Sequence, residues 1–174
     1  MIANRFVTIE STRAGLKARD QSTAQTVLLV DVNHFNDRLV GIFHPSLITV
    51  FIVVEYEGRF LAATEFVQGR SLEDVFQGEP CHPRRAAEIV CELADGVAEL
   101  HSRGLTHGNI THSSAMLTTK GKARLSLASA IGGEELLDVD ALKTVLKTIG
   151  GVTTNEVTNA QSAAVLAAAL RTTS

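Results

Sequence analysis

The chain has 174 residues, of which 45% are hydrophobic and 20% are charged, and its net charge is −3. This size and balance are typical of one globular domain with its own core, and they exclude an intrinsically disordered chain. A small negative charge gives no basic surface for nucleic acid or anionic lipid, so no nucleic-acid and no membrane partner is expected.

The cysteines and the apolar runs bear on the compartment. Cys81 and Cys91 are too few and too irregular for a secreted disulfide framework, which favours a reducing, cytoplasmic location. The first ten residues lack the continuous apolar core of a signal peptide. The longest apolar run, Leu47 to Val54, is far shorter than the roughly 20 residues of a membrane-spanning helix, so it predicts a buried strand.

Two hairpins are predicted in the first part of the chain. Polar and apolar residues alternate from Arg5 to Glu10 and from Leu16 to Arg19, which indicates an opening hairpin. Ile48 to Glu55 and Arg59 to Glu65 predict the arms of another hairpin, because the Glu57-Gly58 pair between them tolerates positive φ.

Between these hairpins the chain is first apolar and then short. Val27 to Val32 is a nearly continuous apolar run, which predicts a buried strand. Asn33 to Phe43 leaves room only for a helical turn or two, or for a loop. Its carboxylate, Asp37, is expected at the surface.

The best-supported helix begins at Pro83 and ends before Gly104. Proline suits a first helical turn and glycine suits the residue after a helix. Apolar residues repeat at helical spacing along one face, which predicts that the helix lies in the core. These residues are Ile89, Leu93, Val97 and Leu100. A shorter helix is predicted after Ser71, an N-cap residue that pairs with Asp74.

The remaining elements alternate between strand and helix. Ala115 to Thr118 and Ala123 to Leu127 are strand-like and are joined by a turn at Lys120-Gly121. An Ala-rich terminal helix is predicted from Ala160 to Leu170.

One stretch of the sequence contains a motif that can be compared with that of a known family. Residues 100–117 read LHSRGLTHGNITHSSAML, which resembles LHSRG-hydrophobic-x-HRDLKPxNILL of the bacterial Ser/Thr protein kinase family. KARDQSTAQTVLLVDV is similar to the family's strand that carries a lysine, and FLAATEFVQGRSLEDVF to its hinge. The resemblance covers roughly Lys17 to Gly150.

The resemblance implies an α+β, protein kinase-like fold with two lobes in a single domain of residues 1–174. The N-lobe, about residues 1–66, would be a small antiparallel sheet with a reduced or missing regulatory helix. A hinge at about residues 65–69 would lead to a mostly helical, truncated C-lobe at about residues 70–174.

Other residues stand where the family holds ATP and metal. Val30 replaces the strand lysine, Asn109 replaces the catalytic aspartate, and Leu127 replaces the aspartate of Asp-Phe-Gly. The degenerate positions together are Val30, Asn109, Thr111, Ser114, Leu127, Ala128 and Ser129. Leucine offers Mg²⁺ no oxygen, and an amide cannot accept a proton. The chain is therefore predicted to be a truncated pseudokinase and not an enzyme, with no metal and no cofactor.

Two further roles follow from the resemblance. His107 is expected to pack and hydrogen-bond structurally, and Asp138 to brace the catalytic loop from below. One alternative stays open at the hinge, where Thr64 would be the gatekeeper. Backbone groups of Glu65 and Val67 could bind adenine, which would make the chain a metal-independent nucleotide sensor without phosphotransfer.

The leading hypothesis is a protein-interaction or scaffold module in a Ser/Thr kinase signalling pathway. Its partner would be an active Ser/Thr kinase or a regulator of one, and the lobe faces left uncovered by shortening also favour a homodimer. A phosphate on a threonine would add about −1.5 to −2 charge. The candidate sites for such a partner are Thr153, Thr154, Thr158, Thr172 and Thr173.

Overall fold

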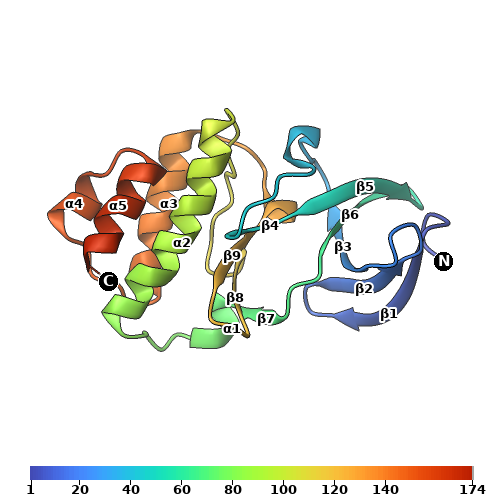
Figure 1. Cartoon of the computed structure of the whole chain (residues 1–174), viewed down its shortest axis with the longest axis horizontal. Coiled ribbons are helices and arrows are strands. Elements are labelled where there is room, and N and C mark those ends of the chain that lie inside the picture. The colour runs from blue at the N-terminus through green and yellow to red at the C-terminus, as the bar shows by residue number, and fades with distance from the viewer. Residues whose placement is uncertain (174) are drawn as a thin grey trace.

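The computed structural model describes residues 1–173 and shows two lobes side by side (Figure 1). Ser174, the last residue of the predicted domain, lies outside the described residues. One lobe is an antiparallel sheet and the other is largely helical, which confirms the predicted α+β, kinase-like two-lobe fold. The residue boundaries given above for the lobes and the hinge stay predictions.

Five antiparallel strands form the N-lobe, in the spatial order β1-β2-β3-β6-β5. They are β1 (Phe6–Thr12), β2 (Gly15–Asp20), β3 (Thr26–Val32), β5 (Val50–Tyr56) and β6 (Arg59–Glu65). Both predicted hairpins are confirmed. At the β5–β6 turn, Glu57 and Gly58 adopt φ values of 51° and 72°. These values lie in the left-handed region, which this residue pair was predicted to tolerate.

The predicted continuous strand from Leu47 to Val54 is wrong in one respect, because the chain changes sheet at Thr49. β4 (Leu47–Ile48) pairs in parallel with β9 (Ala123–Ser126) of the other lobe, and β5 begins one residue after Thr49. The Thr49 N–H donates to Glu65 Oε1 at 2.9 Å, and its hydroxyl donates to the Ile42 carbonyl at 2.8 Å. These two bonds hold Thr49 outside both strands.

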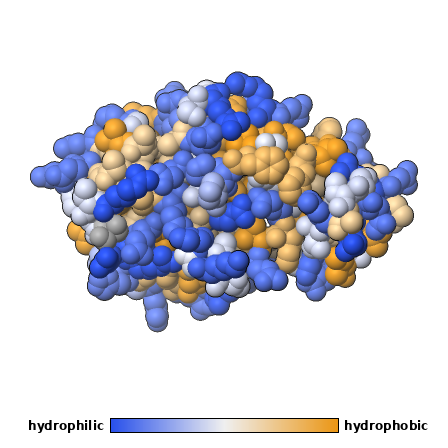
Figure 2. All heavy atoms as spheres, viewed as in Figure 1, coloured by the Kyte–Doolittle hydropathy of each residue, from blue (hydrophilic) through white to orange (hydrophobic). Residues whose placement is uncertain are grey.

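The segment between β3 and β4 contains one short 3₁₀ helix, η1 (Asp37–Leu39). This confirms that a helical turn or a loop replaces a full helix there. Asp37 is exposed, as predicted, and Leu39 is buried. Hydrophobic residues gather over the region of η1 and β5 on the face seen in Figure 2. Phe43 is exposed, and its ring centroid lies 6.4 Å from that of Phe51 in β5.

Up to Thr173, the last residue that the structure describes, the C-lobe combines a second sheet with five α-helices. The sheet has the order β4-β9-β8-β7, with β7 (Gly69–Ser71) and β8 (Ala115–Thr118), and the sequence pattern predicted only its β8–β9 hairpin. The helices are α1 (Leu72–Phe76), α2 (Pro83–Ser102), α3 (Glu135–Thr148), α4 (Asn155–Asn159) and α5 (Ala163–Thr173). Within residues 1–173, no helix is both long and apolar enough to cross a lipid bilayer.

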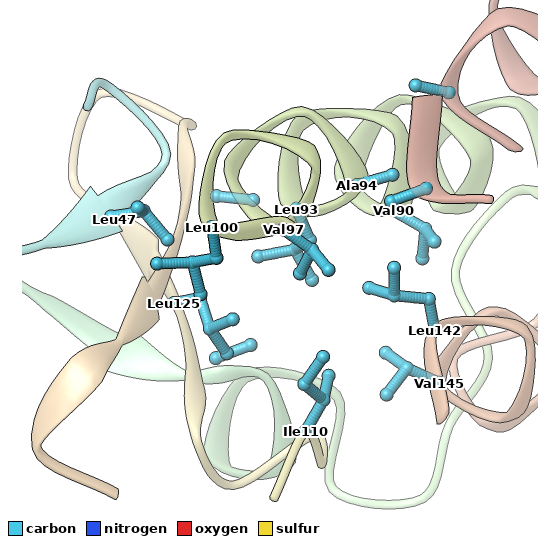
Figure 3. Close-up of a cluster of buried hydrophobic side chains, with 14 of the residues drawn as sticks. Leu47, Val90, Leu93, Ala94, Val97, Leu100, Ile110, Leu125, Leu142 and Val145 are labelled. Atoms are coloured by element: carbon cyan, nitrogen blue, oxygen red, sulfur yellow. The ribbon is translucent and has the colours of Figure 1, made fainter. Parts of the chain in front are cut away.

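The long helix α2 lies at the centre of the larger core, as its apolar face predicted. Leu93, Val97 and Leu100 have no exposed surface and point toward Leu125 of β9 and Leu142 of α3 (Figure 3). Full burial of each such side chain stabilises the fold by about 1.5–3 kcal/mol. This packing fixes the loop that follows α2, which carries the candidate site.

The N-lobe has a separate small core, and a part-buried ion pair lies beside it, with the Arg5 guanidinium over the ring of the core residue Phe6. Asp20, which is 3% exposed, accepts two hydrogen bonds of 2.8 Å from the Arg5 guanidinium. Its carboxylate also accepts from the Ser22 N–H and the Thr23 hydroxyl. The Arg5 hydrogen bonds are the main cause that holds the pKa of Asp20 well below its ordinary value, although burial opposes them.

We therefore expect acid to weaken the fold partly through Asp20. A carboxyl group whose pKa is lowered on folding stabilises the protein above its ordinary pKa near 4, and this contribution is lost as the pH falls further. Asp20→Asn should lower the free energy of unfolding at pH 7 and flatten its decline below about pH 4. Urea unfolding between pH 7 and pH 2.5 measures both effects. The same change at the exposed Asp31 is the control, and equal pH profiles for the two variants would contradict the assignment.

Candidate functional site

A cleft of about 1140 Å³ lies between the two lobes and contains most of the positions singled out from the sequence. Val30 of β3 lines one side, and Thr64, Glu65 and Val67 line the side of the hinge. Ser114, Ala128 and Ser129 line the part that belongs to the C-lobe. Asn109, Thr111 and Leu127 are not among the residues that line the cleft.

The β3 position that corresponds to the family's lysine carries no charge. Val30 is half-buried and pairs with Ala62 of β6. Along β3 the buried residues Val27, Leu29 and Val32 are separated by half-buried or exposed ones, so the prediction of a buried strand holds for one face only. Leu28, Val30 and Asp31 of this strand line the cleft. An apolar side chain at this point offers nothing to a phosphate group.

Leu127 belongs to the core instead of the cleft. It begins the short 3₁₀ helix η2 (Leu127–Ser129), has no exposed surface and is part of the main hydrophobic cluster. The apolar side chains of this cluster offer a metal ion no oxygen ligand.

The polar side chains of the loop already have hydrogen-bond partners, either within the loop or at Ser129. The Ser114 hydroxyl accepts from the Thr111 N–H at 2.9 Å and donates to the Thr111 carbonyl at 3.0 Å. The Thr111 and Ser113 hydroxyls are 2.8 Å apart. The Asn109 side-chain amide donates to the Ser129 carbonyl at 3.1 Å. A carboxylate at position 109 could not donate this bond, so the amide has a structural use in this chain.

Asp138 at the start of α3 holds the loop from below. Its Oδ2 accepts from the His107 N–H at 2.8 Å and lies 2.9 Å from His101 Nε2, and its Oδ1 accepts from the Gly108 N–H at 2.8 Å. Asp138 is 1% exposed, so the three bonds compensate a buried charge. The sequence placed Asp138 here by resemblance but did not predict the contact with His101.

The His107 ring has a defined protonation state. It is fully buried, and burial lowers its pKa, so the ring is neutral at pH 7. Nε2 donates to the Ser126 carbonyl at 2.8 Å, and Nδ1 accepts from the Asn109 N–H at 3.2 Å. The ring thereby joins the loop to the end of β9.

The segment after η2 packs directly on the same loop. The Ile131 and Gly132 N–H groups donate to the His107 carbonyl at 2.8 and 3.0 Å. Gly108, at φ 77°, comes so close to the Gly132 backbone that a Cβ atom on Gly108 would collide with the Gly132 carbonyl. The connector from Ala130 to Glu134 is therefore packed closely against this loop.

The lining of the cleft is negative overall. Two arginines and four carboxylates line it, which leaves a charge of −2 with His112 neutral. Both arginines contact Asp74 of α1: Arg13 through an ion pair, and Arg70 through a 2.6 Å hydrogen bond to the backbone carbonyl. The Arg13–Asp74 pair joins the β1–β2 turn to α1 at the lining of the cleft, and no pattern in the sequence predicted this contact.

The hinge is fixed by a second ion pair that was not predicted. Arg124 of β9 donates to both carboxylate oxygens of Glu65, at 2.7 and 3.2 Å. Burial by itself would raise the pKa of Glu65, but the hydrogen bonds from Arg124 and from the Thr49 N–H outweigh it and lower this pKa. Thr64 is buried, and its hydroxyl donates to the Glu65 carbonyl at 3.1 Å.

Among residues 1–173, no group of three or more His, Cys, Asp or Glu side chains could hold a metal ion. His101, His107 and His112 in particular make separate contacts, with Asp138, Ser126 and Glu73 respectively.

Together these features define a kinase-like protein: a five-stranded sheet, a hinge, a cleft and a His-Gly-Asn loop braced by an aspartate from a following helix. Comparison with known proteins agrees. The chain is 26% identical over 107 residues to the serine/threonine-protein kinase pkn2 of Myxococcus xanthus, a match that covers 62% of this chain and 13% of that protein. It is 28% identical over 99 residues to the serine/threonine-protein kinase PknJ of Mycobacterium tuberculosis, covering 57% and 15%.

A third relative is the probable serine/threonine-protein kinase PknB of Lactococcus lactis, 23% identical over 103 residues that cover 57% of this chain and 16% of that protein. The curated homologues thus include bacterial Ser/Thr protein kinases, and the matched part spans well under a fifth of their length. No protein-family model matches the chain.

These names correct one prediction. The relatives are named as protein kinases, which are enzymes. This finding contradicts the prediction that the chain is not an enzyme. The physical reason is that a replaced residue excludes a particular contact but does not exclude every reaction. Val30, Asn109 and Leu127 show which family contacts the chain cannot make, and they do not show that it performs no chemistry.

Proposed function

We propose that this chain acts in a Ser/Thr kinase signalling pathway as a protein-binding regulatory module built on the kinase-like fold. The observation that carries the proposal is the charge of the cleft, which is −2 over its lining residues and includes no lysine. A negative cleft without a lysine suits a fold that is kept for its protein-binding surfaces better than one that is kept to bind a magnesium–triphosphate complex.

The physical argument is one of uncompensated charge. ATP brings about four negative charges, and kinases offset them with a lysine, metal ions and the side chains that hold those ions. In this chain the corresponding residues are Val30, a buried Leu127, and Ser114, whose hydroxyl is bonded to Thr111. The two arginines at the cleft contact Asp74 and would have to leave it to reach a phosphate.

We expect Mg²⁺ to add nothing to any effect of ATP on this protein. A ligand at 100 times its dissociation constant stabilises the folded state by about 2.7 kcal/mol, which a thermal-shift titration detects easily. With millimolar ATP the melting temperature should be the same with Mg²⁺ and with EDTA. AMP and adenosine serve as controls for the phosphates. A melting temperature that rises further when Mg²⁺ joins ATP would contradict the expectation.

The partner itself is sought by affinity capture. The purified chain is immobilised, exposed to lysate of its native source, and the retained proteins are identified by mass spectrometry. We expect a Ser/Thr kinase or a regulator of one, which is then purified and titrated against the chain. Failure of every purified candidate to bind in that titration would overturn the proposal.

Surface features support a partner or a second copy. The reduced segment around η1 leaves Phe43 69% exposed beside Phe51, and Ile131 of the connector is 72% exposed. Apolar side chains gathered at such points favour protein contacts. Sedimentation velocity across a hundredfold concentration range distinguishes a homodimer from a monomer that awaits another protein.

One observation favours a second function, a nucleotide sensor that binds adenine at the hinge without metal. Val67 lines the cleft, and within residues 1–173 its backbone N–H makes no hydrogen bond. An adenine ring could accept from it, since a backbone donor needs no particular side chain. This function requires equal thermal shifts with adenosine and with ATP, whereas the protein-binding proposal requires neither.

We also propose a cytoplasmic location. Cys81 and Cys91 are both free thiols, and burial raises the pKa of each, so they stay protonated. Free, unreactive thiols suit a reducing compartment. Fractionation of the native source with antibodies to the chain tests this directly.

A further inference from the structure

A second, smaller concavity of about 460 Å³ lies between the hinge and the β8–β9 hairpin. Phe66, Val67 and Pro45 give it an apolar part, and Lys120, Lys122 and Arg124 of the hairpin give it three cations. No carboxylate is among its lining residues. We call it the hinge groove.

The sign of the hinge groove is opposite to that of the interlobe cleft and to that of the chain as a whole, whose net charge is −3. Arg124 is compensated by Glu65, but its Nε is buried and makes no hydrogen bond within residues 1–173. Lys122 is 72% exposed and reaches Glu92 only at 3.7 Å, a contact of little strength. Lys120 forms no ion pair in the described part of the chain.

The hairpin is held in place before any partner arrives. The Thr119 N–H donates to the Gln68 carbonyl at 3.0 Å, which ties the hairpin to the hinge. On the other side, Arg85 of α2 donates to the Gly121 carbonyl, and the Ala123 N–H donates to Glu92 at 2.7 Å. A fixed groove loses little freedom on binding, which favours affinity.

We propose that the hinge groove binds an acidic segment of a partner protein, with apolar side chains against Phe66 and Val67 and carboxylates toward Lys120 and Lys122. Charge complementarity selects this occupant, because a basic or neutral segment would bring no carboxylate to Lys120 and Lys122. The inference rests on the proposed protein-binding function and adds to it the surface and the chemistry of the partner.

A random dodecapeptide library displayed on phage tests the proposal. Peptides selected on the immobilised full chain should be rich in Asp or Glu together with Leu, Ile, Val or Phe. A selected peptide is then synthesised and titrated against the wild type and against Lys120→Gln/Lys122→Gln. We expect the double variant to bind the peptide about tenfold more weakly than the wild type does. Added salt should also lower the affinity of the wild type for the peptide.

The matched control is Arg19→Gln/Lys147→Gln, which removes the same charge from exposed residues of β2 and α3 outside the groove. It should bind the peptide as the wild type does. Selection without acidic enrichment, or equal affinity of both double variants, overturns the groove proposal.

The partner capture described above separates this proposal from the proposed function. If Lys120→Gln/Lys122→Gln still binds the purified partner as the wild type does, the groove is wrong and the function stands. If the wild type binds no purified candidate, the function itself fails, whatever the peptides show.

Discussion

Replacing Asp138 by alanine should cost this protein about 3–5 kcal/mol of its free energy of unfolding. The change removes a carboxylate that accepts from the His107 and Gly108 N–H groups and contacts His101. Asp138 is 1% exposed, so water cannot easily replace it at these groups. Buried donors without partners lose the full cost of their desolvation. In a chain of this size the melting temperature should fall by on the order of 10 °C.

Asp140→Ala is the matched control for this prediction. Asp140 lies two residues further along α3 with its side chain 60% exposed, and its ion pair with Lys143 is 3.9 Å long. We expect a change within about 0.5 kcal/mol. Chemical unfolding measured on both variants decides the matter, and a similar loss in each would show that Asp138 does not brace the loop.

The second large effect is expected at Leu127, where restoring the family's aspartate should damage the fold. Leu127 has no exposed surface and lies in the main apolar cluster. A carboxylate there would be buried without a partner and would leave a void, so we expect Leu127→Asp to cost more than about 4 kcal/mol at pH 7.

The pH dependence of this variant gives an independent check. Burial raises the pKa of an introduced carboxyl group, so the variant should lose stability, relative to the wild type, as the pH rises from 5 to 8. Leu127→Met keeps the volume and the polarity, and it should cost less than about 1.5 kcal/mol at every pH. An Asp variant that is as stable as the Met variant, or that Mg²⁺ stabilises, would show that position 127 can serve a metal site.

The sequence predicted the elements whose signals are local. The spacing of Ile89, Leu93, Val97 and Leu100 predicted the buried face of α2, because helical periodicity depends only on neighbouring turns. Alternation predicted the first N-lobe hairpin, and the Glu57-Gly58 pair predicted the second. The two-lobe arrangement was implied by the family resemblance of the motif around His107. The same reasoning missed the break at Thr49, because that break depends on hydrogen bonds to Glu65 and to the Ile42 carbonyl.

The candidate site was predictable as positions but not as contacts. The resemblance identified Val30 and Asn109 as replacements, yet it could not show that the Asn109 amide holds the Ser129 carbonyl. The Arg124–Glu65 and Arg13–Asp74 pairs join residues 59 and 61 positions apart, and no periodicity connects such residues. Nor did the low charge of the whole chain indicate a negative cleft and a basic groove that share the hinge.

The most direct test of the central claim, that this cleft has no place for a triphosphate held by metal, is a crystal structure of the full chain. The crystals are grown with a nonhydrolysable ATP analogue and Mg²⁺ at concentrations that saturate kinases. We predict no ordered triphosphate and no divalent ion between the lobes, with Arg13 still on Asp74. Ordered phosphates with a metal ion beside Ser114 or Ser129 would contradict the account.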